Sequence, residues 1–288
     1  MNRTSETVME IINRIPRMAS IARELRAEGK RTGLVPTGGA LHEGHLSLMT
    51  RAREMCDAVI VSVLTDRLGD EASDKPAVDL ARDAELAFTR GVDLIFAPAA
   101  EHMFPHSTYV TVESLSEKLE GASLPGHFRN VTTVLDKLLN IVHPHFVFFG
   151  RKGAQEVVLV KRMARELAID VEVVVCPTVR EEDGLALSSS NIDLNTEERK
   201  AATVLRRALE RCLSLYTGGE RDAGRLIASM RSAIEAESLA RIDYIAITDT
   251  QGLDPIDVIP AATPTLVSIA VYIGDTRLTD NIVLNGEL

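Results

Sequence analysis

The fold is decided by residues 32–45, which read Thr32-Gly33-Leu34-Val35-Pro36-Thr37-Gly38-Gly39-Ala40-Leu41-His42-Glu43-Gly44-His45. The first six residues predict a short buried strand that ends in a glycine loop. From His45 to Met55 the apolar residues recur at helical spacing, which predicts a helix. A buried strand that leads through a loop into a helix is a building unit of parallel α/β sheets.

Strand and helix patterns alternate outward from this stretch. Ala58 to Leu64 is a continuous apolar run, which indicates a parallel strand covered on both faces. Further strands are predicted at 93–97, 146–149 and 171–175, and helices at 77–90, 130–142 and 155–167. The alternation predicts an α/β fold with a doubly wound parallel sheet, whose ligands bind beyond the carboxyl ends of the strands.

Two regions depart from this alternation. Thr4 to Gly29 has helical spacing interrupted by Pro16, which predicts two short helices or a kink. After about residue 185 the pattern predicts a smaller α+β domain, so we expect two domains, residues 1–184 and 185–288. This second domain should contain helices at 196–216 and 223–238 and short strands at 242–248, 265–272 and 282–284.

Composition narrows the class of protein. The net charge of the 288 residues is -10, which argues against non-specific nucleic-acid binding but not against one bound nucleotide. No apolar run is long enough for a membrane span, and the N-terminal stretch predicts no signal peptide. The cysteines, Cys56, Cys176 and Cys212, have no metal-site spacing. We therefore expect reduced thiols in a cytoplasmic protein, without a metal site.

The two histidines at the predicted helix start are the sharpest chemical signal. His42 and His45 bracket Gly44, and both imidazoles can point at one phosphate chain beside the backbone N–H groups of the helix N-terminus. Gly44 would let a nucleotide approach the backbone closely. Donors aimed at the charge that builds on the phosphates would accelerate adenylate formation. The alternative is a pair of packed histidines at an ordinary helix start.

Three further stretches carry polar groups after predicted strands or before a predicted helix. Gly184 to Asn191 offers several serine hydroxyls for phosphate, or an N-cap for the next helix. Gly150 to Gln155 follows a strand and carries Lys152, which could reach phosphates or lie on a solvated basic loop. Pro125 to Arg129 precedes a helix, and Arg129 could hold a carboxylate or order a loop.

These stretches, in this order, resemble the pantoate–β-alanine ligases (pantothenate synthetases), within the nucleotidylyltransferase superfamily. The resemblance covers nearly the whole chain, including Leu119-Glu120-Gly121-Ala122, Pro177-Thr178-Val179-Arg180-Glu181 and Thr276-Arg277-Leu278-Thr279-Asp280-Asn281. It implies a Rossmann-like N-terminal domain, a C-terminal lid domain, a homodimer, and ATP with Mg²⁺. Members of this family adenylate pantoate, and the amine of β-alanine then displaces AMP.

The resemblance also implies roles for individual residues. His42, His45 and Lys152 would be catalytic, with Lys152 stabilising pentavalent phosphorus. Ser188 and Ser189 would close over ATP. Further ATP contacts would come from Pro36, Thr37, Gly39, Gly44, Gly150 and Val179. The acid pocket would be formed by Gly38, Arg67, Gly69, Arg129, Gln155 and Glu156.

Several positions depart from the family pattern. Gly38 replaces a methionine of the pocket wall, and Gly69 and Glu156 replace the two glutamines that bind pantoate. Gly153 replaces a ribose-binding aspartate, and Ser190 replaces an arginine that binds phosphate. Glu156 would repel a carboxylate unless protonated or paired, and Arg67 could offset it or bind another acid.

Four hypotheses follow from these matches and departures. The chain is a pantoate–β-alanine ligase with a rearranged pocket, or a paralogue that joins a different acid and amine. It could instead be a catalytically weak nucleotide-binding regulatory homologue, or an ordinary nucleotidylyltransferase that keeps AMP on its product. The retained His42, His45 and Lys152 favour an enzyme, and the lost glutamines argue against unchanged pantoate binding.

Overall fold

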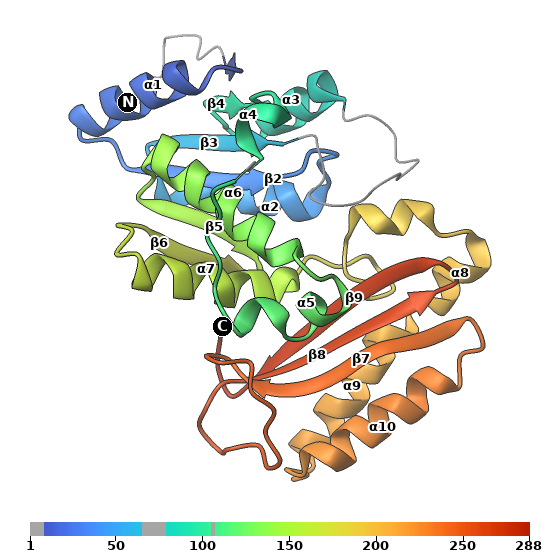
Figure 1. The fold of residues 1–288 in the computed structure, drawn as a ribbon. Helices are drawn as coiled ribbons and strands as arrows, with labels where there is room; N and C mark the ends of the chain where they lie inside the picture. The colour runs from blue at the N-terminus through green and yellow to red at the C-terminus, as the bar shows by residue number, and fades with distance from the viewer. Residues whose placement is uncertain (1–8, 65–78, 105–106) are drawn as a thin grey trace. The chain divides into compact units, whose positions relative to one another are not determined.

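The computed structural model describes residues 9–64, 79–104 and 107–288. The chain divides into two compact units (Figure 1). Unit 1 comprises Met1–Val112, Gly126–Gly150 and Leu159–Cys176, and unit 2 comprises Glu113–Pro125, Arg151–Val158 and Pro177–Leu288. Unit 2 thus includes two short segments that come before residue 177, and each unit is described by itself.

Unit 1 is built on a six-stranded sheet in the order β1-β4-β3-β2-β5-β6. Every pairing is parallel, which confirms the predicted parallel α/β sheet. Strand β3 is buried at all six positions, as expected for a strand covered on both faces. The strands are Glu10–Ile12 (β1), Thr32–Thr37 (β2), Ala58–Val63 (β3), Leu94–Phe96 (β4), Phe146–Gly150 (β5) and Glu172–Cys176 (β6).

Along the chain, helices lie between the successive strands of unit 1 (Figure 1). They are Ile15–Ala27 (α1), Glu43–Met55 (α2), Leu80–Thr89 (α3), Ala100–Met103 (α4) and His127–Val142 (α6). Helix α7, Ala154–Glu166, begins in unit 2 and continues into unit 1. Met49 of α2 packs with Val35, Val61 and Phe148 of the sheet in one core cluster, and all four side chains are 0% exposed. This packing fixes the start of α2 at the carboxyl end of β2.

The prediction for the N-terminal segment was wrong in one respect. Glu10–Ile12 forms strand β1, paired in parallel with β4, where helical spacing had predicted a helix. Pro16 lies in the first turn of α1 and opens the helix instead of kinking it. Proline is accommodated there because the first N–H groups of a helix have no partner within it. Residues 4–8 of that prediction, and the predicted loop at 66–78, lie outside the described residues.

Unit 2 contains a three-stranded antiparallel sheet in the order β7-β8-β9. Its strands are Ala240–Asp249 (β7), Thr265–Ile273 (β8) and Thr276–Leu284 (β9). The predicted helix at 196–216 divides into α8 (Thr196–Ala201) and α9 (Val204–Thr217), and α10 is Ala223–Glu235. Short helical turns are Leu115–Glu117 (η1), Glu120–Ser123 (α5), Arg151–Gly153 (η2) and Ser189–Asp193 (η3).

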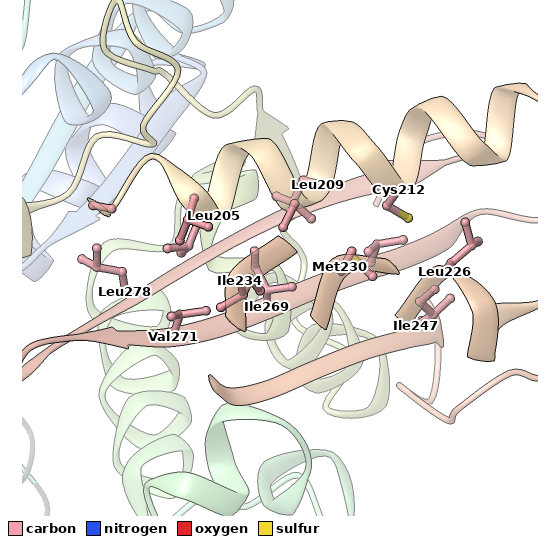
Figure 2. Packing of buried hydrophobic residues seen from close by; sticks show 14 of the residues in the cluster. Leu205, Leu209, Cys212, Leu226, Met230, Ile234, Ile247, Ile269, Val271 and Leu278 are labelled. Carbon is pink, nitrogen blue, oxygen red and sulfur yellow. The ribbon is translucent and has the colours of Figure 1, made fainter. Parts of the chain in front are cut away.

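Helices α9 and α10 cover one face of this sheet. Figure 2 shows Leu209 of α9 and Met230 of α10 against Ile269 of β8, and all three are fully buried. Leu278 of β9 belongs to the same core. Because side chains alternate along a strand, Arg277, Thr279 and Asn281 lie on the opposite face of β9. That face therefore carries polar groups.

Candidate functional site

The start of α2 is built by His42 and His45 themselves. His42 is the N-cap, and its Nδ1 atom accepts a hydrogen bond from the Gly44 N–H at 3.1 Å. The His45 Nδ1 atom accepts from the His42 N–H at 3.4 Å, which completes a capping box. The ring centroids are 4.0 Å apart. Because Nδ1 accepts in both rings, a neutral imidazole at either position carries its proton on Nε2.

Gly44 is required by the His42 ring. A Cβ atom at position 44 would lie 2.7 Å from the Cε1 atom and 2.9 Å from the Nδ1 atom of His42. Both separations are shorter than real contacts, so any side chain would push the imidazole away. Packing against His42 therefore gives a reason for this glycine. The close approach of a nucleotide, expected from the sequence, would be a second reason.

The loop before α2 is held by short polar contacts. The Thr37 hydroxyl donates to the Ser62 carbonyl at 2.7 Å and accepts from the Gly39 N–H at 3.4 Å. Gly39 has φ +80°, a conformation that favours glycine. The carboxylate of Asp83, which is 1% exposed, accepts from the Leu41 N–H at 2.9 Å. Sequence reasoning missed Asp83 because it lies in α3, with no local motif around it.

The other residues of unit 1 that were predicted for the site lie on several different elements. Pro36 is half-buried in β2, and Gly38 is exposed. Gly150 ends β5, where a Cβ atom would meet nothing within 4 Å. Arg129 of α6 is exposed and places its guanidinium 4.1 Å from the centre of the Tyr109 ring. Arg67 and Gly69 lie outside the described residues.

Lys152 belongs to unit 2, in turn η2 directly after β5. Its Nζ atom is 3.4 Å from the Thr279 hydroxyl of β9. Burial lowers the pKa of Lys152, whereas the carboxylates of Glu120 and Asp280 act to raise it. The structure thus brings Lys152 together with acidic groups of α5 and β9, and it places the histidine pair in the other unit.

Gln155 holds a backbone segment in place. Its Nε2 atom donates to the carbonyls of Leu115 at 2.9 Å and Lys118 at 2.7 Å. Its Oε1 atom accepts from the Glu120 N–H at 3.0 Å, and the residue is 6% exposed. Both ends of the amide are therefore engaged with residues 115–120.

Glu156 and Gly153 share one space. A Cβ atom at position 153 would lie 3.1 Å from the Glu156 Oε2 atom, so the missing side chain makes room for this carboxylate. Burial raises the pKa of Glu156 to about 7, and the nearby Glu120 carboxylate acts in the same direction. Glu156 therefore changes charge near neutral pH.

Glu120 is also held by an arginine that sequence reasoning gave no role. The Arg277 Nη1 atom donates to Glu120 at 2.9 Å, and its Nε and Nη2 atoms donate to Asp243 at 3.0 and 2.9 Å. Ser123 of α5 also donates to Asp243. The segment of unit 2 around α5 is thus tied to the polar face of its sheet.

The serine stretch forms the N-terminus of η3. Ser188 is the N-cap of this turn, and its hydroxyl accepts from the Ser190 N–H at 3.3 Å; Ser189 is the first residue of the turn. The helix that begins at Thr196 is capped by Asn195 and not by a serine of this stretch. The Val179 carbonyl accepts from the Leu187 N–H at 3.0 Å. Arg180 binds the Asp280 carboxylate through two hydrogen bonds of 2.7 and 2.9 Å. These bonds fix the approach to Ser188 within unit 2.

Two findings concern other classes of site. Over residues 9–64, 79–104 and 107–288, no group of three or more His, Cys, Asp or Glu side chains could hold a metal ion, and the three cysteines are free and buried. Burial raises the pKa of Cys56 and of Cys212 to about 11, so both thiols stay protonated near neutral pH. No helix in the described part of the chain is long and apolar enough to cross a membrane.

The parallel sheet, with imidazole donors at the helix start after β2, defines an α/β protein of the nucleotide-binding type. Comparison with known proteins is more specific. A family model described as Pantoate-beta-alanine ligase matches residues 10–283. The chain belongs to this family.

Relatives match over nearly their whole length. A pantothenate synthetase of Pelotomaculum thermopropionicum is 49% identical, over 97% of this chain and 100% of its own. One from Heliobacterium modesticaldum is 48% identical, over 96% and 99%. A crystal structure of the Thermus thermophilus pantothenate synthetase has a TM-score of 0.87 at 38% identity, and 95% of this chain and 99% of that chain are covered.

A further solved structure bears on the ligands. The pantoate-beta-alanine ligase of Francisella tularensis, complexed with beta-gamma ATP and beta-alanine, is 28% identical with a TM-score of 0.74. The match covers 96% of this chain and 98% of that chain. These comparisons favour the first of the four hypotheses, a pantoate–β-alanine ligase.

Proposed function

We propose that this protein adenylates pantoate with ATP and joins it to β-alanine. A carboxylate oxygen of pantoate attacks the α-phosphorus, and the bond to the β-phosphate breaks as pyrophosphate leaves. The β-alanine amine then attacks the acyl carbon, AMP leaves with the bonding electrons, and the amine loses a proton to solvent. The observation that carries the proposal is the histidine-capped start of α2, where two imidazoles lie beside the N–H groups of a helix N-terminus, a combination that suits a phosphate chain.

We assign ATP binding to residues from both units, with a separate role for the catalytic residues and for the other contacts. His42, His45 and Lys152 would stabilise the charge that develops on the phosphates, and Lys152 would face pentavalent phosphorus. The other proposed ATP contacts are Pro36, Thr37, Gly39, Gly44, Gly150, Val179, Ser188 and Ser189. Mg²⁺ would be held mainly by the phosphates. Bound there, it would screen phosphate charge.

The acid pocket is assigned to Gly38, Arg67, Gly69, Arg129, Gln155 and Glu156. The Gln155 amide already makes three hydrogen bonds to the backbone of residues 115–120, so it would shape the pocket by holding that segment. Glu156 would contact the acid when protonated and repel it when ionised.

We also propose that residues 1–184 bind ATP and the acid, and that residues 185–288 act as a lid. The protein would work as a homodimer in the cytoplasm.

Product formation tests the proposed reaction. The purified protein is incubated with ATP, Mg²⁺, pantoate and β-alanine, and the amide and AMP are measured by mass spectrometry. We expect equal amounts of amide and AMP, and neither when pantoate or β-alanine is omitted. Amide formation only with a different acid or amine would refute the proposal and favour the paralogue hypothesis.

Replacing Gly44 with alanine should separate activity from stability. The new Cβ atom would displace the His42 ring, so we expect amide formation to slow by about tenfold, because small misplacements of catalytic groups are costly. The free energy of unfolding should change by less than about 1 kcal/mol, since lost capping is offset by the better helix propensity of alanine.

Gly224 offers a matched control for that substitution. It occupies the same position after the N-cap Asp222 of α10, and a Cβ atom there would lie 3.1 Å from the Asp222 Oδ1 atom. Gly224→Ala should leave the rate of amide formation unchanged. Equal rate losses in both variants would mean that the effect comes from helix starts in general.

A further inference from the structure

Strand β9 contains a buried amide that clamps the turn bearing Lys152. Asn281 is 3% exposed, and its Nδ2 atom donates to the carbonyl of Arg151 and to the carbonyl of Lys152, both at 2.9 Å. Both N–H bonds of the amide are used in this way. The clamp therefore fixes the backbone on the two sides of the Lys152 Cα atom.

The turn needs such support from outside. Turn η2 has three residues, Arg151–Gly153, and 3₁₀ turns of this length have weak hydrogen bonds of their own. Lysine also has a flexible four-carbon stem that does not by itself fix the place of its amine, so a fixed backbone at least sets where that stem starts. Thr279, on the same face of β9 as Asn281, lies 3.4 Å from the Nζ atom. Strand β9 thus contacts Lys152 at both its backbone and its amine.

Asn281 is itself held rigidly. Its backbone N–H donates to the Asp280 Oδ1 atom at 2.8 Å, and Asp280 is 2% exposed and paired with Arg180. On β8, Ser268 is the register partner of Asn281. The clamp is therefore anchored by the sheet on one side and by the ion pair of the buried Asp280 with Arg180 on the other.

The chemistry of position 281 favours a requirement for an amide. Among the described residues, the Asn281 Oδ1 atom is buried and has no hydrogen-bond donor. Burying an unpaired acceptor is unfavourable, so an apolar side chain would suit this site better if packing were its only task. The two N–H bonds to the Lys152 turn explain why an amide is placed there.

We infer that Asn281 is a positioning residue for adenylation, which directs the Lys152 amine through the backbone of its turn. The inference rests on the proposed role of Lys152 at the phosphates. Asn281 itself touches neither ATP nor the acid in this account. It acts on the rate of adenylation, and we expect it to have little effect on the KM for pantoate.

The substitution Asn281→Asp keeps the size of the side chain and removes both donors. We expect kcat for pantoate-dependent ATP–pyrophosphate exchange to fall by about tenfold, with the KM for pantoate changed by less than about twofold. Asn285→Asp is the matched control, because Asn285 also donates its amide to a backbone carbonyl, that of Pro260 at 2.7 Å. The control should keep the kcat of the parent protein.

A double-substitution cycle tests whether Asn281 acts through Lys152. On a Lys152→Ala background, Asn281→Asp should cause no further loss of exchange, because the group that it positions is absent. A further tenfold loss on that background would overturn the inference. Should Asn281→Asp fail to fold by circular dichroism, Asn281→Ser replaces it in the same cycle.

A readout that needs no activity separates this inference from the proposed function. Acetic anhydride labels lysine amines, and mass spectrometry compares Lys152 with the exposed Lys200. The neutral change Asn281→Ser should raise the relative labelling rate of Lys152 several-fold, and Asn285→Asp should not. Absence of exchange in the parent protein would refute the proposed function but not the inference on Asn281. An unchanged labelling rate of Lys152 in Asn281→Ser would overturn the inference that Asn281 holds the Lys152 turn.

Discussion

Replacing Lys152 with alanine should lower the rate of pantoate-dependent ATP–pyrophosphate exchange by about 10²–10³-fold, the usual loss when one donor to a charged transition state is removed. The substitution leaves the η2 backbone free to keep its hydrogen bonds to Asn281, so the fold should survive. Exchange of labelled pyrophosphate into ATP measures the rate. Circular dichroism confirms folding.

The control for this loss is Lys200→Ala. Lys200 lies in the same unit, is largely exposed, and forms an exposed ion pair with Glu197 at 3.2 Å. Its removal should leave exchange unchanged. A Lys152→Ala protein that exchanges at the parent rate would remove Lys152 from the proposed machinery.

Replacing Glu156 with glutamine should lower the KM for pantoate at pH 8 by about 10–100-fold, the range expected when a repelling group becomes one that can donate a hydrogen bond to a charged acid. Because burial raises the pKa of Glu156 to about 7, the parent protein should bind pantoate progressively less well as the pH rises from 6 to 8. The substitution should abolish that trend. A KM that varies with pH equally in both proteins would exclude Glu156 from the acid pocket.

Glu156→Gln should also change the free energy of unfolding, and the raised pKa of Glu156 decides the direction of that change. Between the ordinary value of 4.5 and about 7, the folded chain holds a proton on Glu156 that the unfolded chain has lost. Burial of this group therefore costs stability increasingly as the pH rises through that window, up to about 3 kcal/mol above it, at about 1.4 kcal/mol for each pH unit. Glu156→Gln should recover much of this at pH 8.

Urea unfolding at two pH values measures that recovery. Glu156→Gln should raise the free energy of unfolding at pH 8 and change it little at pH 4.5, where the parent side chain is protonated in the folded state. Glu197→Gln, at an exposed position, should change neither value appreciably. Equal gains at both pH values would mean that shape, not charge, causes the effect.

Most of the sheet of unit 1 could be predicted from the sequence because its strands are continuous apolar runs, as in Ala58–Val63. Strand β1 could not, because its three residues are held only by pairing with β4, a contact with no local signal. The sequence also did not predict that Glu113–Pro125 belongs to unit 2. It depends on the bonds of Gln155 and Arg277, which join residues far apart in the chain.

The candidate site also contains residues with a local sequence signal and residues without one. The His42-Glu43-Gly44-His45 stretch could be interpreted because capping box, glycine and helix start are all local. The part played by Asn281 could not, since its partners are 130 and 129 residues away. Sequence resemblance marked this residue without giving it a role, and only the geometry supplies one.

The most direct test of the account is ATP–pyrophosphate exchange by the purified protein, with pantoate as the added acid. We expect exchange that depends on pantoate and that is faster at pH 6.5 than at pH 8 when pantoate is below its KM. Lactate should not support exchange. Exchange with another small acid but not with pantoate, or measurable ATP binding without exchange, would contradict it.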